Sequence, residues 1–292
     1  MVKSSSVKIS DLLIALFIFL MILLCLMPML NLLARSLSSP QAIVNRQVTF
    51  WPVDLTWESY QYVFLDKSFS RSMIWTAILC VTFTVFSLIM TILCAFPLIY
   101  KTLKGRKLFN TMVIFTMYFS AGTIPNYVLM KQLNLLNNPL VLILPGCLSV
   151  FNMIILKSFF FGIPESLRES AEMDGASPPT VLLRIYLPLS TSVLATLALF
   201  YAVGRWNGFS DALLYLTKPD FHPIQLKLYN IINNLTSIEI AAAEGASANA
   251  PPIMSDGMKA AAVMFATVPI LVIYPWLQRY FIKGVSLGAI KE

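Results

Sequence analysis

Six charge-free apolar runs dominate the sequence and restrict what the chain can fold into. A helix needs roughly 20 residues to cross a hydrocarbon core of about 30 Å, and each run is about that long or longer. The composition agrees, because 58% of the 292 residues are hydrophobic and only 12% are charged. We therefore predict an all-α membrane protein with six transmembrane helices, at residues 12–34, 72–100, 108–130, 132–156, 185–204 and 260–278.

The first run follows Lys3 and Lys8, as a secretory signal would, but it is longer than the apolar core of a signal peptide and lacks a clear cleavage site. We expect it to stay as a helix. The positive-inside rule sets its orientation, since short cytoplasmic loops are rich in Lys and Arg. With the N-terminus inside, the cytoplasmic side takes the basic hairpin 101–107 and most basic residues near the helix ends. Both termini are therefore predicted to be cytoplasmic.

Several residue types give no sign of chemistry. The net charge of +7 is explained by topology, and no basic stripe with interleaved aromatic residues suggests nucleic-acid binding. The four cysteines, Cys25, Cys80, Cys94 and Cys147, all fall inside apolar runs, where we expect buried free thiols and no disulfide or metal. His222 has no second ligand nearby in sequence, so no metal site is predicted.

A polar segment at residues 161–189 interrupts the apolar runs and carries ordered helix signals. Gly162 and Pro164 are typical of a helix start, with proline at the first helical position. Gly175, after Asp174, is typical of a helix end, because glycine adopts the left-handed conformation without steric cost. Ser177 can then cap a second short helix that begins with prolines. We predict two short helices that meet at a glycine corner.

The spacing inside this segment resembles the cytoplasmic EAA loop of bacterial ABC importer permeases. That pattern is Glu-Ala-Ala, three residues, Gly, nine residues and Ile-x-Leu-Pro. Here Glu169, Ser170 and Ala171 hold the triplet, with serine in place of the middle alanine, and the later positions are held by Gly175, Ile185, Leu187 and Pro188. The end of the chain, 284–292, is similar to the C-terminus of the second permease of maltose-type importers, with Ile290 where the family has Val.

The resemblance covers nearly the whole chain and implies a type I ABC importer permease of the carbohydrate family. The nearest systems import oligosaccharides or polysaccharide fragments, including uronate-rich ones from alginate or pectin. The implied organisation is one transmembrane permease domain, 1–292, with a core transport region at 71–281, the coupling loop 161–189 and a cytoplasmic tail at 282–292. The implied location is the bacterial cytoplasmic (inner) membrane, crossed several times.

The same resemblance implies the partners and the residues that meet them. The coupling loop would dock on an ATPase, with Glu169 as the salt-bridge partner of a basic residue there. The expected partners are a homologous second permease, two ATPase subunits, an extracytoplasmic solute-binding protein and membrane lipid. The chain has no Gly-rich phosphate loop, so ATP and Mg are expected on the ATPase, with no cofactor and no catalytic residue here. The docking residues would be Glu169, Ser170, Ala171, Asp174, Gly175 and Ala176.

A polar cluster at residues 201–211 ends the fifth apolar run. A charge at membrane depth faces water, a bundle interior or a partner charge. Arg205 can therefore pair with Asp211 or extend to the interface. Alternatively, it can line an outward cavity in which Trp206 stacks on a sugar face. We name five candidate residues of a substrate path: Tyr201, Arg205, Trp206 and Asn207 in this cluster, and Asn152 within the fourth run.

Two other function classes remain for comparison. An ion-coupled secondary sugar transporter is the main alternative, but such carriers place Asp, Glu or His inside their spans, and the six runs contain none. A membrane-embedded polysaccharide-processing enzyme would need a pair of carboxylates near one face. Glu239, Glu244 and Asp256 share one predicted loop, whose alanine-rich surroundings form no motif.

Overall fold

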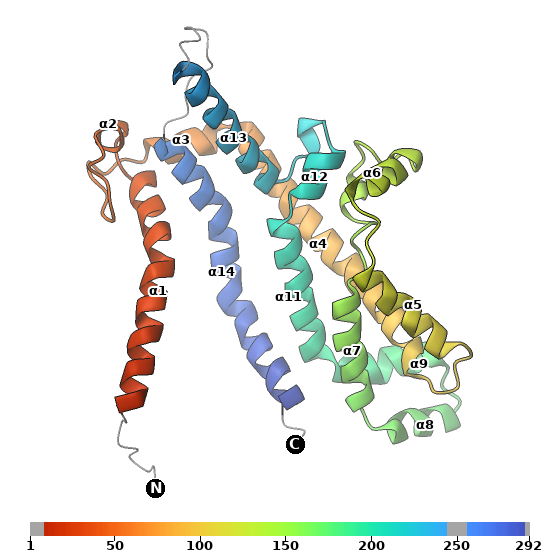
Figure 1. Cartoon of the computed structure of the whole chain (residues 1–292). Coiled ribbons are helices and arrows are strands. Elements are labelled where there is room, and N and C mark those ends of the chain that lie inside the picture. The colour runs from red at the N-terminus through yellow and green to blue at the C-terminus, as the bar shows by residue number, and fades with distance from the viewer. Residues whose placement is uncertain (1–8, 244–255, 290–292) are drawn as a thin grey trace. The chain divides into compact units, whose positions relative to one another are not determined.

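The computed structural model describes residues 9–243 and 256–289, and these ranges form helices joined by turns, without a strand (Figure 1). The chain divides into two compact units. The first contains Met1–Ser70 and Leu228–Val268, and the second contains Arg71–Lys227 and Pro269–Glu292. Both candidate sites lie in the second unit.

The first unit is built on α1, Ile9–Ser36, which confirms the first predicted helix. Most of its large apolar side chains are exposed, as expected for a helix that faces lipid, and Cys25 is exposed with them rather than buried as predicted. The unit also holds α2, Pro40–Val44, and α3, Glu58–Leu65. Ser36 Oγ lies 2.9 Å from Tyr60 Oη, which joins α1 to α3.

The second predicted helix is confirmed as α4, Lys67–Ala95. It continues after Phe96 into a 3₁₀ turn, η1, Pro97–Ile99. The regular helix therefore ends at the proline, as expected for a residue without a backbone donor.

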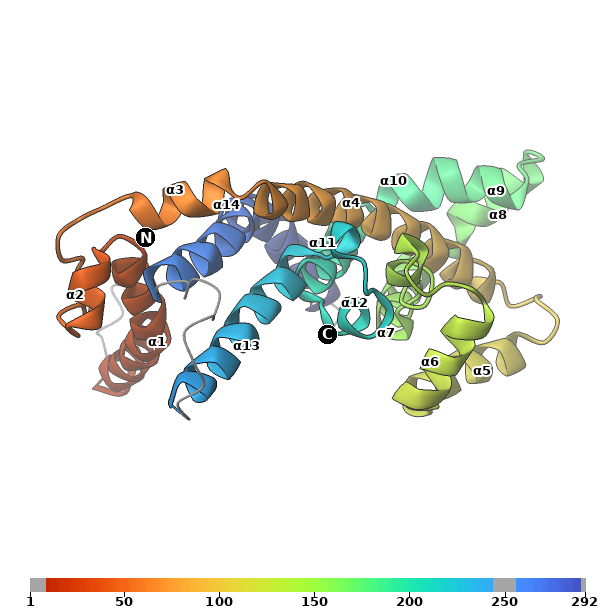
Figure 2. The same ribbon diagram turned by 90° about the horizontal axis from the view of Figure 1, so that it is seen from above.

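The third predicted helix is broken. It forms α5, Arg106–Tyr118, and α6, Thr123–Gln132, which are bent by 115° relative to each other (Figures 1 and 2). The break includes Gly122, whose φ of +90° favours glycine.

The prediction of one helix over 132–156 is wrong, because regular α-helix resumes only at α7, Val150–Gly162. Between α6 and α7 lie turns and a short 3₁₀ element, η2, Pro139–Leu142. Asn137 has a positive φ of 58°, which a helix cannot contain. Its side-chain oxygen accepts hydrogen bonds from the backbone N–H of Thr217 at 2.7 Å and from the Thr217 hydroxyl at 2.8 Å. Local turn chemistry here overrides the apolar composition.

The polar segment after α7 forms short helices, and the fifth predicted helix, 185–204, is divided by a bend. α8, Glu165–Met173, follows α7 at an angle of 74°. One helical run then comprises α9, Pro178–Val181, the π-helix η3, Leu182–Tyr186, and α10, Leu187–Leu189 (Figure 2). A bend of 83° at Ser190 separates it from α11, Thr191–Asn207. Pro188 lacks the N–H that would continue the ladder, which is consistent with a bend there.

The remaining elements are α12, Ser210–Tyr215, the 3₁₀ turn η4, Pro219–Phe221, and two long helices, α13, Ile224–Ala243, and α14, Asp256–Ala289. The prediction of a loop that contains Glu239 is wrong over α13, which starts where the Thr76 hydroxyl accepts from the Ile224 N–H at 2.8 Å. The sixth predicted helix lies within α14. The end of the predicted tail, 290–292, lies outside the described residues.

Within residues 9–243 and 256–289, three helical stretches, in α1, α4 and α14, are long and apolar enough to cross a membrane by themselves. The number rises to six if each bent pair counts as one span. In the second unit, α7 contacts both α5 and α11 (Figure 1). The buried side chains between these elements form the core that supports both sites, and they include Phe96, Met153, Leu156, Phe160, Tyr186 and Leu197.

Candidate functional site: coupling loop and polar pocket

The glycine corner predicted in the coupling loop is present. α8 ends at Met173, Asp174 is its C-cap, and Gly175 has a φ of +83°. The Gly175 N–H donates to Glu172 O at 3.1 Å, and the Ala176 N–H donates to Ala171 O at 2.9 Å. These two bonds form a Schellman motif, which explains why glycine occupies this position.

The start of α8 differs in detail from the prediction. Pro164 precedes the first helical residue and is the N-cap rather than the first helical position. Ser177 is the N-cap of α9, but its hydroxyl lies 3.0 Å from the Thr180 hydroxyl and caps no backbone N–H. The two helices therefore form as predicted, while the local hydrogen bonds at their starts differ.

One arginine organises α8, and the sequence analysis did not identify it as a site residue. The Arg168 side chain is only 14% exposed and lies 2.8 Å from Glu165, 3.8 Å from Glu169 and 3.0 Å from Glu172. Its guanidinium also lies over the Tyr100 ring, 5.0 Å from the centroid. We call these five residues the Arg168 cluster. Its helical signal is visible in the sequence as acids at positions −3 and +4 from the arginine.

A second ion pair connects α8 to the hairpin after α4. Lys101 Nζ lies 2.8 Å from Glu165 Oε2. The hydrogen bond from Lys101, with its positive charge, lowers the pKa of the Glu165 carboxyl below its usual value. Burial raises the pKa of Tyr100 to about 12, so its phenol stays neutral beneath the guanidinium. The hairpin and α8 are therefore linked by both charge and ring contacts.

The six predicted docking residues lie together at the corner of the loop. The Glu169 side chain is 62% exposed, and its single ion pair among the described residues is the long one to Arg168. Ser170, Asp174 and Gly175 are also exposed, whereas Ala171 and Ala176 are half-buried and pack against the core. A hollow of about 550 Å³ lies inside the corner, with Asp174 and Arg184 among its lining residues. Met173, which the sequence analysis did not select, is 84% exposed beside it.

The corner rests on three aromatic rings. Phe96, Phe160 and Tyr186 come from the end of α4, from α7 and from η3. Their ring centroids are 5.3 Å apart for Phe96–Tyr186 and for Phe160–Tyr186, in edge-to-face geometry. Close-packed interiors transmit displacement. A movement of the loop would therefore act directly on three elements of the second unit.

The second candidate region is organised by Arg205 at the end of α11. Arg205 is 7% exposed, and its two terminal nitrogens donate to Asp211 Oδ2 at 2.5 Å and to Asp211 Oδ1 at 2.9 Å. They also donate to the carbonyls of Leu142, at 3.1 Å, and Gly208, at 3.2 Å. Of the alternatives left open by the sequence, the pairing with Asp211 is the one present.

The shape of this turn depends on Gly208. A Cβ at this position would lie 3.2 Å from Arg205 Nη2. The guanidinium also lies over the Phe83 ring, 5.7 Å from the centroid. We call Arg205, Asp211, Phe83 and the carbonyls of Leu142 and Gly208 the Arg205 cluster.

A polar pocket of about 680 Å³ opens beside the Arg205 cluster. It brings together three of the five predicted path residues, Asn152, Tyr201 and Arg205. The Tyr201 hydroxyl is occupied, since it lies 2.7 Å from the Thr91 hydroxyl and accepts from the Ser149 N–H at 3.1 Å. The other lining residues combine aromatic rings with small polar groups, and they include Phe83, Ser149, Phe151, Phe200, Ser210 and Asp211.

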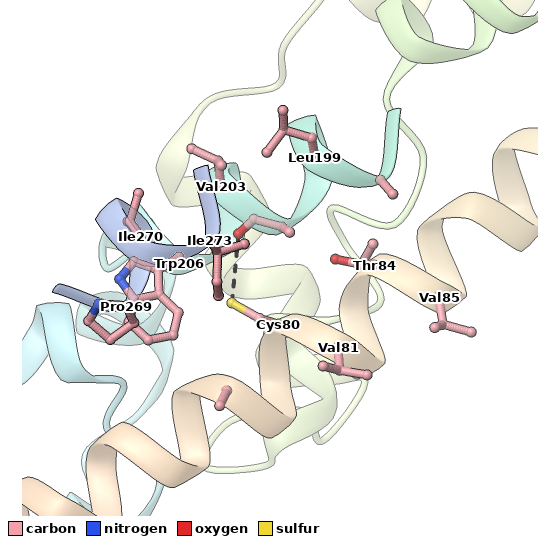
Figure 3. Close-up of a pocket in the computed structure, with 13 residues that line it drawn as sticks. Cys80, Val81, Thr84, Val85, Leu199, Val203, Trp206, Pro269, Ile270 and Ile273 are labelled. Carbon is pink, nitrogen blue, oxygen red and sulfur yellow. Dashed lines mark hydrogen bonds between the residues drawn. The ribbon is translucent and has the colours of Figure 1, made fainter. Parts of the chain in front are cut away.

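The other two predicted path residues lie elsewhere. Trp206 is buried and lines a separate apolar pocket of about 340 Å³ in the second unit (Figure 3). Figure 3 shows the Trp206 ring beside Pro269 and Ile270. In the same pocket, Cys80 Sγ lies 3.7 Å from Ala202 O. Asn207 is exposed and lines neither of these pockets. Adjacent helical residues point in different directions, so the Arg-Trp-Asn run divides between environments.

Among the residues that the structure describes, no group of three or more His, Cys, Asp or Glu side chains is placed to hold a metal ion. His222 Nε2 lies 3.3 Å from the Leu216 carbonyl oxygen. Of the three acids considered for an enzyme, Asp256 pairs with Arg35 and Lys259, and Glu244 lies outside the described residues.

Comparisons with known proteins place these features in a family. The chain is 41% identical to Protein LplC of Bacillus subtilis over 91% of this chain and 89% of that one. It is 35% identical to the polygalacturonan/rhamnogalacturonan transport system permease protein YtcP of Bacillus subtilis, covering 97% of this chain and 99% of that one.

A solved chain supports the same assignment. It belongs to a bacterial ABC transporter involved in the import of the acidic polysaccharide alginate, and it matches with a TM-score of 0.84 and 30% identity, over 96% of this chain and 99% of that one. The protein thus has the fold of a type I ABC importer permease. The model of one family, the binding-protein-dependent transport system inner membrane component, matches residues 5–287. The chain therefore belongs to the family of binding-protein-dependent inner membrane transport components.

Proposed function

We propose that this chain is the permease subunit of an ATP-driven importer that moves oligosaccharides or polysaccharide fragments, uronate-containing ones among them, into the cytoplasm. The observation that carries the proposal is the exposed corner of the coupling loop, where Glu169 and Gly175 stand at the positions of the family pattern. The relatives named for polygalacturonan, rhamnogalacturonan and alginate transport support the substrate class.

The proposed assembly contains this chain, a homologous second permease, two ATPase subunits and an extracytoplasmic solute-binding protein. ATP and Mg would bind to the ATPase, and this chain would hold no cofactor. Both termini and the coupling loop would be cytoplasmic. The family name, which refers to binding proteins and to the inner membrane, supports the solute-binding partner and the location.

In the proposed mechanism, closure of the ATPase dimer moves α8 as a lever. The ring contacts of Phe96, Phe160 and Tyr186 support this step, because they join the loop to α4, α7 and η3. The Lys101–Glu165 pair would carry the hairpin 101–107 with α8. Helices of the second unit would then rock against the second permease and open the polar pocket to the binding protein.

The test is reconstitution of the complex from the four proposed kinds of subunit in liposomes, with ATP hydrolysis and sugar uptake measured for neutral and uronate oligosaccharides. We expect the ATPase to co-purify with this chain and one sugar class to stimulate hydrolysis. If no ATPase co-purifies and uptake collapses when a protonophore removes the proton gradient, the ion-coupled alternative replaces this proposal.

A further inference from the structure

Both terminal nitrogens of the arginine in the polar pocket, Arg205, are already fully hydrogen-bonded, and this limits which part of a sugar the pocket can bind. A guanidinium has five N–H donors. The four bonds from the two terminal nitrogens of Arg205 go to Asp211, Leu142 and Gly208. Its Nε is buried and has no hydrogen-bond partner among the described residues. Arg205 therefore cannot offer the two parallel donors with which arginine grips a carboxylate.

The charge of the pocket leads to the same conclusion. Asp211 neutralises Arg205 and, with its side chain 33% exposed, turns part of an anionic carboxylate toward the pocket. A uronate carboxylate placed there would be repelled by Asp211 and would lose its water. A sugar hydroxyl, in contrast, can donate to the carboxylate oxygens.

The remaining polar groups suit hydroxyls. Asn152 is 5% exposed and lines the pocket, and its carboxamide has both donors and an acceptor for hydrogen bonds. Ser149 and Ser210 add hydroxyl groups, and Phe151 and Phe200 add aromatic surface. Amide and hydroxyl groups beside aromatic rings match a ligand with apolar faces and polar edges.

We infer that the polar pocket of this chain recognises the hydroxyl groups and ring faces of a sugar unit and does not recognise its carboxylate. Any preference of the assembly for acidic glycans is then set by the binding protein or the second permease. The inference rests on the proposed function and assigns the recognition groups of this pocket, with Asn152 as the main hydroxyl contact.

The experiment compares trigalacturonate with its methyl ester, which differ only in the charged carboxylates, in liposomes that contain the whole transporter. Uptake by each variant is divided by wild-type uptake of the same sugar. We expect Asn152→Ala to lower both values by roughly three- to tenfold, the effect of one lost hydrogen bond. The double variant Arg205→Gln with Asp211→Asn should change both sugars by the same factor. Thr116→Ala, at an exposed position on α5 that lines neither pocket, is the control and should leave both unchanged.

A tenfold or larger loss of trigalacturonate alone in the double variant would overturn the inference, because it would make Arg205 a carboxylate contact. Unchanged uptake of both sugars by Asn152→Ala would also overturn it. Co-purification of the ATPase with each variant separates these outcomes from failed assembly. If the assembled wild-type transporter takes up no sugar of any class, the proposed function fails, and the inference fails with it.

Discussion

Arg168 in the coupling loop and Arg205 at the polar pocket each hold a cluster of side chains together, but the two clusters differ in charge and in exposure. Arg168, on the coupling loop, lies among three glutamates and a tyrosine ring, and Glu169 is the most exposed of those glutamates. Arg205, at the polar pocket, has one acidic partner, Asp211, which accepts hydrogen bonds with both carboxylate oxygens. Two backbone carbonyls accept the other bonds from its terminal nitrogens. The first cluster has an excess of negative charge and the second is neutral.

The difference follows from solvation. Near water, ion pairs contribute little and exchange readily, so a surface cluster can leave an acid available to a partner. In a buried position an unpaired charge is costly, so the arginine must be fully paired. The Arg168 cluster is thus suited to meeting another protein, and the Arg205 cluster is suited to holding a turn in shape.

The largest effect is expected when the buried pair is broken. Arg205→Met leaves the Asp211 carboxylate without its partner and should destabilise the fold by on the order of 2–3 kcal/mol, at the low end for a buried pair because Asp211 is partly exposed. Arg168→Met should cost much less. The thermal midpoint of the purified complex in detergent measures both.

The matched control for this prediction is the double variant Arg205→Met with Asp211→Leu, which removes both charges and should recover more than half of the loss. Equal destabilisation by Arg168→Met and Arg205→Met would remove the contrast between the clusters.

The next effect is expected at the corner of the coupling loop. Gly175→Val forces a β-branched residue into a left-handed conformation, which costs roughly 1–2 kcal/mol. No neighbouring atom lies within 4 Å of a Cβ there, so the cost is one of backbone conformation alone. We expect substrate-stimulated ATP hydrolysis to fall about tenfold, with membrane insertion unchanged. Gly175→Asn is the control, since asparagine tolerates this conformation, and equal rates for the two variants would contradict the role of the corner.

A smaller effect is expected on assembly. Glu169→Lys reverses the exposed charge and should weaken retention of the ATPase by roughly five- to tenfold, as for the loss of about 1 kcal/mol or slightly more. Glu172→Gln removes an acid that already pairs with Arg168 and should reduce retention less. Titration of ATPase into immobilised permease measures both losses. A larger loss with Glu172→Gln would show that Glu172, rather than Glu169, makes the docking contact.

The smallest effect is expected for Lys101→Met, which removes the partner of Glu165. Because the pKa of Glu165 is lowered in the folded state, this pair stabilises the protein above the unfolded value of about 4.3 and loses its effect as the pH falls through the lower folded value. Lys101→Met should therefore lower the thermal midpoint slightly at pH 7, and by less in high salt. A difference from wild type that persists in acid, after the Glu165 carboxyl has been protonated, would contradict the ion-pair explanation.

Local features were predictable because their causes lie within a few residues. The apolar runs of α1 and α4 need only length and composition. The end of α4 at Pro97 and the corner at Gly175 follow from the conformational properties of proline and glycine. The run over 132–156 was misread because composition alone does not show that Asn137 would turn the chain.

Other features depended on residues that lie far apart in the sequence. Arg168 meets Tyr100 from another segment, and Arg205 meets the carbonyl of Leu142. The neighbours Arg205 and Trp206 line a polar and an apolar pocket because the two sides of α11 meet different distant residues, Gly146 and Asn152 on one side and Pro269 and Ile270 on the other.

The sequence alone determined that this chain crosses a membrane, belongs with importer permeases and forms a glycine corner at Gly175, because hydrophobic length and glycine spacing act locally. Only the tertiary structure decided where the spans bend, which glutamate is the most exposed and that both terminal nitrogens of Arg205 are already hydrogen-bonded. Those properties depend on which distant groups compete for the same donors and on how much water reaches them, and neither can be read from neighbours in the chain.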